Sequence, residues 1–216
     1  MTEKLLNILA KEYPLEEIDV GDMSTLKASG MTFSVKAYNA VGLGHVSVMR
    51  AKGFFGLMKM DTLIVNPTEK DLPLYSYDRI FAMGNDTLIV ELYDTLLGEF
   101  SESCLKDIKA QYSSLPYRDP GEHWYDSIKL DSSISTKGKK NLTGTFDELT
   151  SKHFQAYLAE GGNVGSPDRE AKLEKAAYYV NGLLRNGGPS TDVFKKELGD
   201  EKTEKLFNNV LFGISR

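Results

Sequence analysis

Residues 31–93 alternate apolar and polar side chains over several short runs, and this pattern limits the possible folds more than any other feature. The first run alternates from Met31 to Tyr38. Four more runs follow, separated by breaks that mostly contain Gly or Pro: HVSVMRA, GLMKMDTLIV, YSYDRIFAM and DTLIVELY. A period of two indicates β-strands, and Gly84-Asn85 between the last two runs is a strong hairpin signal. The sequence therefore predicts an antiparallel meander.

Helical periodicity flanks this meander. We expect a first helix capped by Thr2 and a second from Glu99 to Tyr112, on whose apolar face Cys104 is a core residue. One strand, SIKLDSS, should follow, and then helices after Thr145, after Ser166-Pro167 and in the segments TDVFKKEL and EKTEKLFNNVLF. Because strands such as FGLMKM and LIVEL are apolar on both faces, helices are expected on both sides of the sheet. The predicted fold class is α+β.

Composition excludes several classes of protein. With 216 residues the chain is long enough for one well-cored domain, which we expect to span residues 1–216. A net charge of −5 gives no support for a nucleic-acid or membrane partner. The single cysteine excludes an internal disulfide, and the three histidines lack metal-ligand spacing, so no metal is expected. Without a signal peptide or a run of ~20 apolar residues, we expect a cytoplasmic protein.

Three acids lie on successive predicted strands: Asp61, Asp78 and Glu91. Charged side chains are rarely buried without a partner or a purpose. Alternation places Asp78 on the same face as Ser76 and Ile80. If Gly84-Asn85 is a two-residue turn, Asp78 lies opposite Glu91, and the like charges should raise the pKa of one carboxyl. A carboxylic acid that is still protonated near neutral pH can act as a proton donor.

Plainer interpretations remain open for each candidate residue. Each acid can be a partly exposed residue or half of a salt bridge, and Asp61 can pair with Lys59. The histidines are interpreted as surface or packing residues. Trp124 is either a packing anchor or the wall of a pocket for a flat ligand. The basic cluster Lys137, Lys139 and Lys140 is either a solvated loop or a clamp for ligand carboxylates.

Several motifs follow the order found in one known family. LPLYSYD (Leu72 to Asp78) and GNDTLIVELYDT (Gly84 to Thr95) match a pattern of L-P-x-[FY]-G-x-D, a hairpin and an acidic segment. RNGGPSTDVFKKELGDEKTEKLFNNVLFGI (Arg185 to Ile214) is similar to the family's Asn-Asp-x-Thr segment and closing helices, and WYDSIKL resembles a Trp-Gly-x-Ile-Phe segment. On these motifs the chain resembles the ferredoxin-dependent bilin reductases, the family of phycocyanobilin:ferredoxin oxidoreductase. The plant red chlorophyll catabolite reductases are its distant cousins.

The resemblance implies a three-layer α/β/α sandwich around a central antiparallel sheet, with an open-chain tetrapyrrole between the sheet and the C-terminal helices. It implies no tightly bound cofactor, since the family takes single electrons from ferredoxin or flavodoxin and protonates the bilin radical with side chains. Asp78 matches the central catalytic aspartate, and Asp61 falls where several members have a histidine that shares its proton. The residues expected to contact the substrate are Met49, Leu63, Tyr77, Lys137 and Asn186.

The chain departs from the family pattern at other positions. Met49 falls where one branch has a glutamate proton donor. Asn186 is retained, but Gly187 replaces the family aspartate that follows it. Lys137 lies within one residue of a family arginine that grips a propionate. These changes leave the position of any reduced bond undetermined.

Three functional hypotheses follow. The first is an oxidoreductase that reduces a carbon–carbon double bond of a bilin such as biliverdin, with Asp78 as proton donor and Asp61 as its partner. The second is a non-catalytic protein of the same fold that binds bilin or haem, which the substitutions at Met49 and Gly187 favour. The third is a globular protein with an unrelated small ligand.

Overall fold

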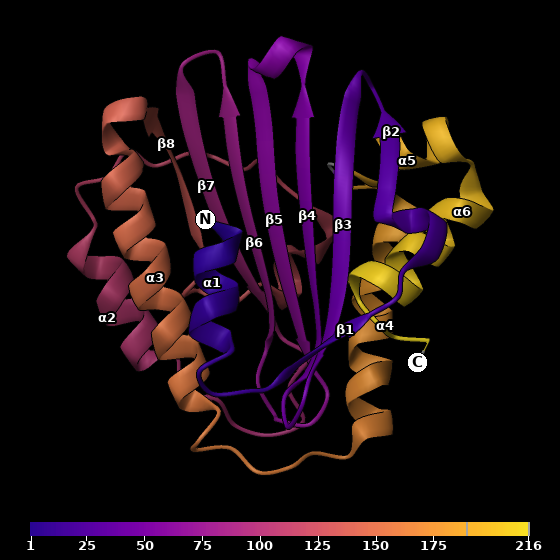
Figure 1. Ribbon diagram of the computed structural model, residues 1–216. Coiled ribbons are helices and arrows are strands. Elements are labelled where there is room, and N and C mark those ends of the chain that lie inside the picture. The colour runs from indigo at the N-terminus through magenta and orange to yellow at the C-terminus, as the bar shows by residue number, and fades with distance from the viewer. Residues whose placement is uncertain (189, 216) are drawn as a thin grey trace.

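The computed structural model describes residues 1–188 and 190–215. An eight-stranded antiparallel sheet forms its centre (Figure 1). The strands are β1 (Leu15–Ile18), β2 (Thr25–Ala28), β3 (Met31–Ala40), β4 (Gly44–Gly53), β5 (Met58–Pro67), β6 (Leu74–Ala82), β7 (Asn85–Tyr93) and β8 (Ile134–Lys139). From β3 to β8 each strand pairs with the next one in the chain, while β1 and β2 pair with opposite halves of β3. The predicted antiparallel meander is confirmed.

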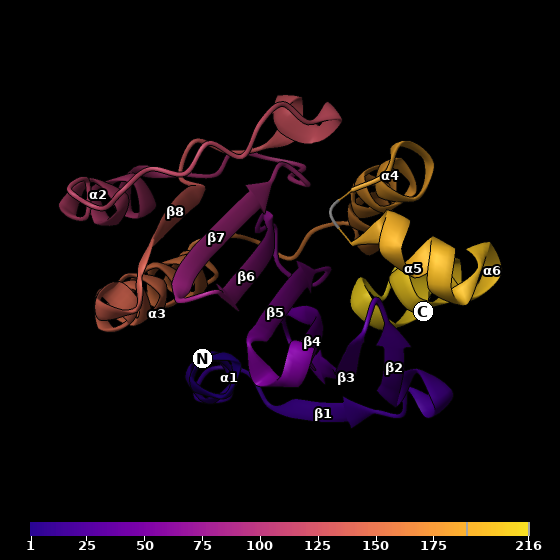
Figure 2. The ribbon, with the colours of Figure 1, turned by 90° about the horizontal axis from the view of Figure 1, so that it is seen from above.

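Helices cover both faces of this sheet. They are α1 (Thr2–Leu9), α2 (Ser103–Gln111), α3 (Thr143–Glu160), α4 (Arg169–Asn186), α5 (Thr191–Leu198) and α6 (Asp200–Lys205), and a π-helical turn, Leu206–Leu211, continues α6. Seen from above, α1 and α3 lie on one side of the sheet and α4, α5 and α6 on the other (Figure 2). We call these the α1/α3 face and the α4/α5 face. The predicted α+β class, with helices on both sides, is confirmed.

Strict alternation divides the apolar side chains of each strand between two cores. On the α1/α3 face, Leu63 and Tyr77 pack with Phe154 of α3. On the α4/α5 face, Ile64 packs in the core that contains Tyr179 of α4. Successive side chains on a strand point to opposite faces, so a fully covered sheet needs apolar residues at both odd and even positions. This explains why the central strands are apolar on both faces.

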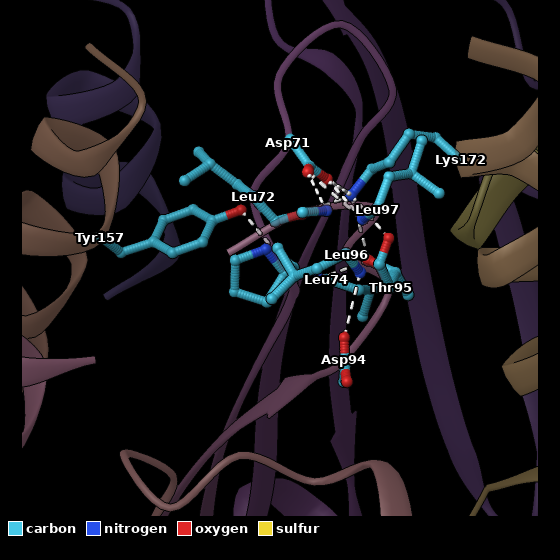
Figure 3. Close-up of polar contacts among 11 residues, drawn as sticks. Asp71, Leu72, Leu74, Asp94, Thr95, Leu96, Leu97, Tyr157 and Lys172 are labelled. Carbon is cyan, nitrogen blue, oxygen red and sulfur yellow. Dashed lines mark hydrogen bonds and ion pairs between the residues drawn. The ribbon is translucent and has the colours of Figure 1, made fainter. Parts of the chain in front are cut away.

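A buried lysine ties α4 to one end of the sheet (Figure 3). The Nζ of Lys172 donates to the carbonyl oxygens of Leu72 (2.7 Å) and Thr95 (2.8 Å), and it pairs with Asp71 at 3.3 Å. From the other face, the hydroxyl of Tyr157 on α3 donates to the Pro73 carbonyl at 2.9 Å. Burial lowers the pKa of Lys172 to about 8, although Asp71 opposes that shift. Helices on both faces of the sheet therefore form hydrogen bonds to the loop that precedes β6.

Some local predictions are wrong. SIKLDSS is not a strand: residues 124–128 form a short 3₁₀ turn, only Lys129 bridges to Tyr93, and the pairing strand β8 begins at Ile134. Thr2 does not cap α1 but is its first residue, and its hydroxyl accepts a hydrogen bond from Arg50. Cys104 is exposed rather than buried, because Leu105 is the residue that α2 buries.

Candidate functional site

Asp78 lies at the centre of the sheet, on the α4/α5 face. Thr62 of β5 lies opposite it on one side and Ile89 of β7 on the other. The Oγ1 of Thr62 donates a hydrogen bond of 2.5 Å to Oδ1 of Asp78. No ion pair joins Asp78 to a cation among residues 1–188 and 190–215. A carboxylate in this position lacks the counter-charge that would stabilise its ionised form.

The surroundings of Asp78 favour its protonated form. Burial raises the pKa of this carboxyl to about 6, the hydrogen bond from Thr62 opposes the shift, and the charge of Glu91 adds to it. The side chain is nevertheless partly accessible from the cavity that it lines. A carboxyl with a pKa close to the working pH can give up a proton and regain one from solvent. Asp78 is therefore suited to proton transfer.

Glu91 lies on the same face as Asp78, but in a different register from the one expected. The predicted pairing of Asp78 with Glu91 is wrong, because Glu91 lies opposite Ser76. The hairpin turn is Met83-Gly84, both with positive φ, rather than Gly84-Asn85. This shifts the register by two residues, which preserves the face. Glu91 accepts a hydrogen bond of 2.6 Å from the Tyr93 hydroxyl.

Asp61 lies on the other face of the sheet. Since Thr62 lies opposite Asp78, the neighbouring Asp61 points toward the α1/α3 face. Its Oδ2 is 3.4 Å from the amino group of Met1. The expected proton sharing between Asp61 and Asp78 is therefore wrong, since the sheet itself separates the two carboxyls. The alternative pairing with Lys59 is also absent from the ion pairs of Asp61 in the described part of the chain.

A cavity of about 290 Å³ lies above Asp78, between the sheet and the helices of the α4/α5 face. Its floor includes three methionine side chains, Met49, Met58 and Met60. Tyr93, Tyr125 and Tyr179 form an aromatic wall, in which the rings of Tyr93 and Tyr179 stack with centroids 4.0 Å apart. Aromatic and thioether groups provide broad, polarisable surfaces for a flat ligand.

Two polar residues that the sequence did not single out also line this cavity, Arg118 and His123. Arg118 donates to the hydroxyl of Ser135 at 3.3 Å and forms no ion pair with a described carboxylate. His123 stacks on Tyr125, and its Nδ1 is buried without a hydrogen-bond partner within the described chain. Both residues are in the irregular segment before β8, where periodicity gives no signal.

The expected substrate contacts divide by face. Met49 lines the cavity. Leu63 and Tyr77 do not, because both are buried in the core of the α1/α3 face. Lys137 is exposed on the outermost strand and Asn186 is exposed at the end of α4, and neither lines the cavity. Trp124 is a packing anchor, since it lies against Gly182 of α4 and its Nε1 donates to the Gly187 carbonyl at 3.3 Å.

A second, larger cavity adjoins the first. Its volume is about 820 Å³, and it lies between α2, β8 and the irregular segment that precedes β8. Glu91 and Pro120 line both cavities. Three lysines line the larger cavity together with three acids, and Lys106 and Lys129 form ion pairs with these acids: Lys106, Lys109, Lys129, Glu91, Asp126 and Asp131. In the part of the chain that the structure describes, no three His, Cys, Asp or Glu side chains form a group able to hold a metal ion.

Comparison with known proteins places this fold. No family model matches the sequence, and no curated protein matches it either. A crystal structure of phytochromobilin synthase from tomato, in complex with biliverdin, is similar in structure, with a TM-score of 0.76 and 17% sequence identity. The match covers 99% of this chain and 83% of the synthase chain. This chain therefore has the fold of phytochromobilin synthase. As a separate observation, none of the described helices is both long and apolar enough to cross a membrane.

Proposed function

We propose that this protein binds an open-chain tetrapyrrole above Asp78 and reduces one of its carbon–carbon double bonds. The observation that carries the proposal is a carboxyl with a raised pKa, Asp78, at the base of a cavity with methionine and tyrosine walls. The similar synthase structure contains biliverdin, a linear tetrapyrrole. A conjugated, flat and largely apolar ligand suits such walls, and a proton donor beneath it suits reduction.

The chemistry requires two electrons and two protons for each double bond. A one-electron carrier, ferredoxin or flavodoxin, delivers the electrons singly and is itself oxidised. Asp78 gives one proton to the ligand radical and is reprotonated from solvent, because its side chain is only partly buried. The second proton comes from solvent through the open side of the cavity. No metal or tightly bound cofactor takes part in this scheme.

The charged ends of the ligand need partners at the rim. Arg118 replaces Lys137 as our candidate for binding a propionate, because Arg118 lines the cavity and has no described carboxylate partner. A guanidinium binds a carboxylate through two parallel hydrogen bonds. The first cavity is small for a whole tetrapyrrole, so the ligand extends past Glu91 and Pro120 into the adjoining cavity.

The test is anaerobic reduction of bound biliverdin by a ferredoxin-reducing system, followed by the loss or shift of its visible band. Asp78→Asn should keep binding but slow the change by about 100-fold or more, which is typical when a positioned proton donor is lost. Asp61→Asn is the matched control: it lies one strand away on the opposite face and should react like wild type. Equal slowing by both substitutions, or none by Asp78→Asn, contradicts the proposal.

One observation favours a second function, a non-catalytic tetrapyrrole carrier. Met49 lies in the cavity where the resemblance expects a glutamate in one branch, and Asp61 points away from Asp78. Of the candidate acid–base residues, only Asp78 and Glu91 then line the cavity. A stable complex with biliverdin or haem that never changes under reducing conditions would support the carrier and exclude the reductase.

A further inference from the structure

Three hairpin turns meet at one end of the sheet, the upper rim in Figure 1. They join β2 to β3 at residues 29–30, β4 to β5 at residues 54–57, and β6 to β7 at residues 83–84. The pairs Met31–Gly53 and Met58–Ala82 place neighbouring turns side by side. We call the turn residues and the last residues of their strands the hairpin rim.

The hairpin rim exposes a group of large apolar side chains: Phe54, Phe55, Leu57 and Met83. Phe55 is fully exposed, at 108% of its reference area, and Met83 is 90% exposed. The other exposed large apolar residues in the described chain are dispersed: Val41, Leu97, Tyr117 and Tyr178. Single exposed apolar residues need no explanation, but a contiguous group indicates an interaction site.

The backbone holds these side chains outward in an unfavourable conformation. Phe54, Phe55 and Met83 have φ of 50°, 56° and 52°. Bulky residues rarely adopt the left-handed region, whereas Gly and Asn do so at little cost. A strained conformation that displays aromatic side chains to solvent sacrifices stability, which points to a use outside the fold.

The charge of the hairpin rim is opposite to that of the whole chain. Its segments 27–32, 52–59 and 81–85 contain no Asp or Glu, nor does the adjoining end of β8 at residues 137–141, although the net charge is −5. Lys52 and Lys59 lie opposite each other on adjacent strands, and neither forms an ion pair with a described carboxylate. Like charges in such cross-strand pairs are destabilising. Lys27, Lys139 and Lys140 extend the basic rim along the same end of the sheet.

We propose that the hairpin rim docks this protein onto the surface of an anionic lipid bilayer. Phe54 and Phe55 insert at the boundary of headgroups and acyl chains, while the lysines contact anionic headgroups. A bilayer fits better than a protein partner because the apolar residues protrude from convex turns. A stable protein interface needs roughly 800 Å² of complementary surface on each partner. The acidic remainder of the protein is repelled, which fixes the orientation.

Co-sedimentation with vesicles tests the proposal. The full chain should bind vesicles of phosphatidylcholine with about one-third phosphatidylserine, bind pure phosphatidylcholine weakly, and dissociate as salt screens the lysines. The double substitution Phe54→Asn and Phe55→Asn should lower the partition coefficient at least tenfold, since two phenyl groups no longer leave water. Its Tm should equal or exceed that of wild type, because Asn tolerates the left-handed conformation. This separates lost binding from lost folding.

Two further variants sharpen the test. Lys52→Gln with Lys59→Gln should lower binding to the phosphatidylserine vesicles at least tenfold while leaving the fold intact, and some preference for them should remain because Lys27, Lys139 and Lys140 are unchanged. Val41→Asn changes an exposed apolar turn residue at the opposite end of the sheet and should bind like wild type. The proposal is overturned if wild type does not bind the anionic vesicles, or if the Phe variant binds them equally. It is also overturned if the rim joins two copies of the chain, or holds an acidic protein instead of lipid.

Discussion

Replacing Asp78 by Asn should make the protein more stable near neutral pH. Asn has the same shape and its Oδ1 can still accept the hydrogen bond from Thr62. What disappears is the cost of ionising a carboxyl in the middle of a covered sheet. Because burial raises the pKa of Asp78 from 3.8 to about 6, folding favours the protonated form. The stability associated with that form is complete below the unfolded-state pKa and is lost as pH rises through the folded-state pKa.

The size of the effect follows from the two pKa values. A difference of about two pKa units corresponds to a total of about 3 kcal/mol between low and high pH. Between about pH 5 and about pH 7.5, the linkage relation gives a loss of about 1.4 kcal/mol from the wild-type free energy of unfolding. Asn has no such dependence, so the variant's advantage over wild type should grow by that amount across this interval.

Urea denaturation of both proteins at the two pH values measures this quantity. Subtracting the wild-type value from the variant value at each pH cancels the titration of all other groups, provided that both proteins unfold in two states with equal m-values. If the free energy of unfolding of the variant minus that of wild type is the same at both pH values, the pKa of Asp78 is not raised. The argument that Asp78 is a proton donor would then be refuted as well.

The other predictions concern the environment of this carboxyl and the attachment of α4. Thr62→Val removes the hydrogen bond that opposes the pKa shift of Asp78, so the pH dependence measured above should move to higher pH. Gly182→Ala places a Cβ only 2.0 Å from the ring of Trp124, which should cost about 1–3 kcal/mol in urea denaturation and change the emission of this single tryptophan. Lys172→Met removes the donor to the Leu72 and Thr95 carbonyls and the cation that pairs with Asp71, whose carboxylate keeps only the amides of Leu97 and Gly98. It should cost about 3 kcal/mol by the same assay; an unchanged free energy of unfolding would show that the contacts are not maintained in solution.

The sequence predicted a raised pKa in this pair of acids, but neither the residue nor the correct cause. It suggested that like charges on Asp78 and Glu91, directly opposite each other, would raise the pKa of one of the two carboxyls. In the structure burial is the largest cause, and Glu91 contributes less. The two-residue change in the register follows from the turn at Met83-Gly84, which a sequence-based preference for Gly-Asn pairs does not reveal. Because a shift of two residues keeps each side chain on the same face of the sheet, the face predicted for Glu91 was nevertheless correct.

The position of Asp61 could not be read from the sequence in the same way. β5 and β6 are joined by a loop of six residues, from Thr68 to Pro73, and a long loop does not set the register. Only the pairing of Thr62 with Asp78 decided that Asp61 faces away. Asp61 cannot share a proton with Asp78, because its neighbour Thr62 faces Asp78 and successive side chains on a strand point to opposite faces.

The sequence by itself determined the five strands from β3 to β7, their antiparallel order and the side chains that share a face with Asp78, because alternation and short turns are local properties. Tertiary structure alone decided what covers that face. Tyr179 from α4, and Arg118 and His123 from an irregular segment, line one cavity with Asp78 only in the folded chain. Burial, and with it the pKa of a carboxyl, depends on neighbours far away in the sequence, so no local pattern contains it.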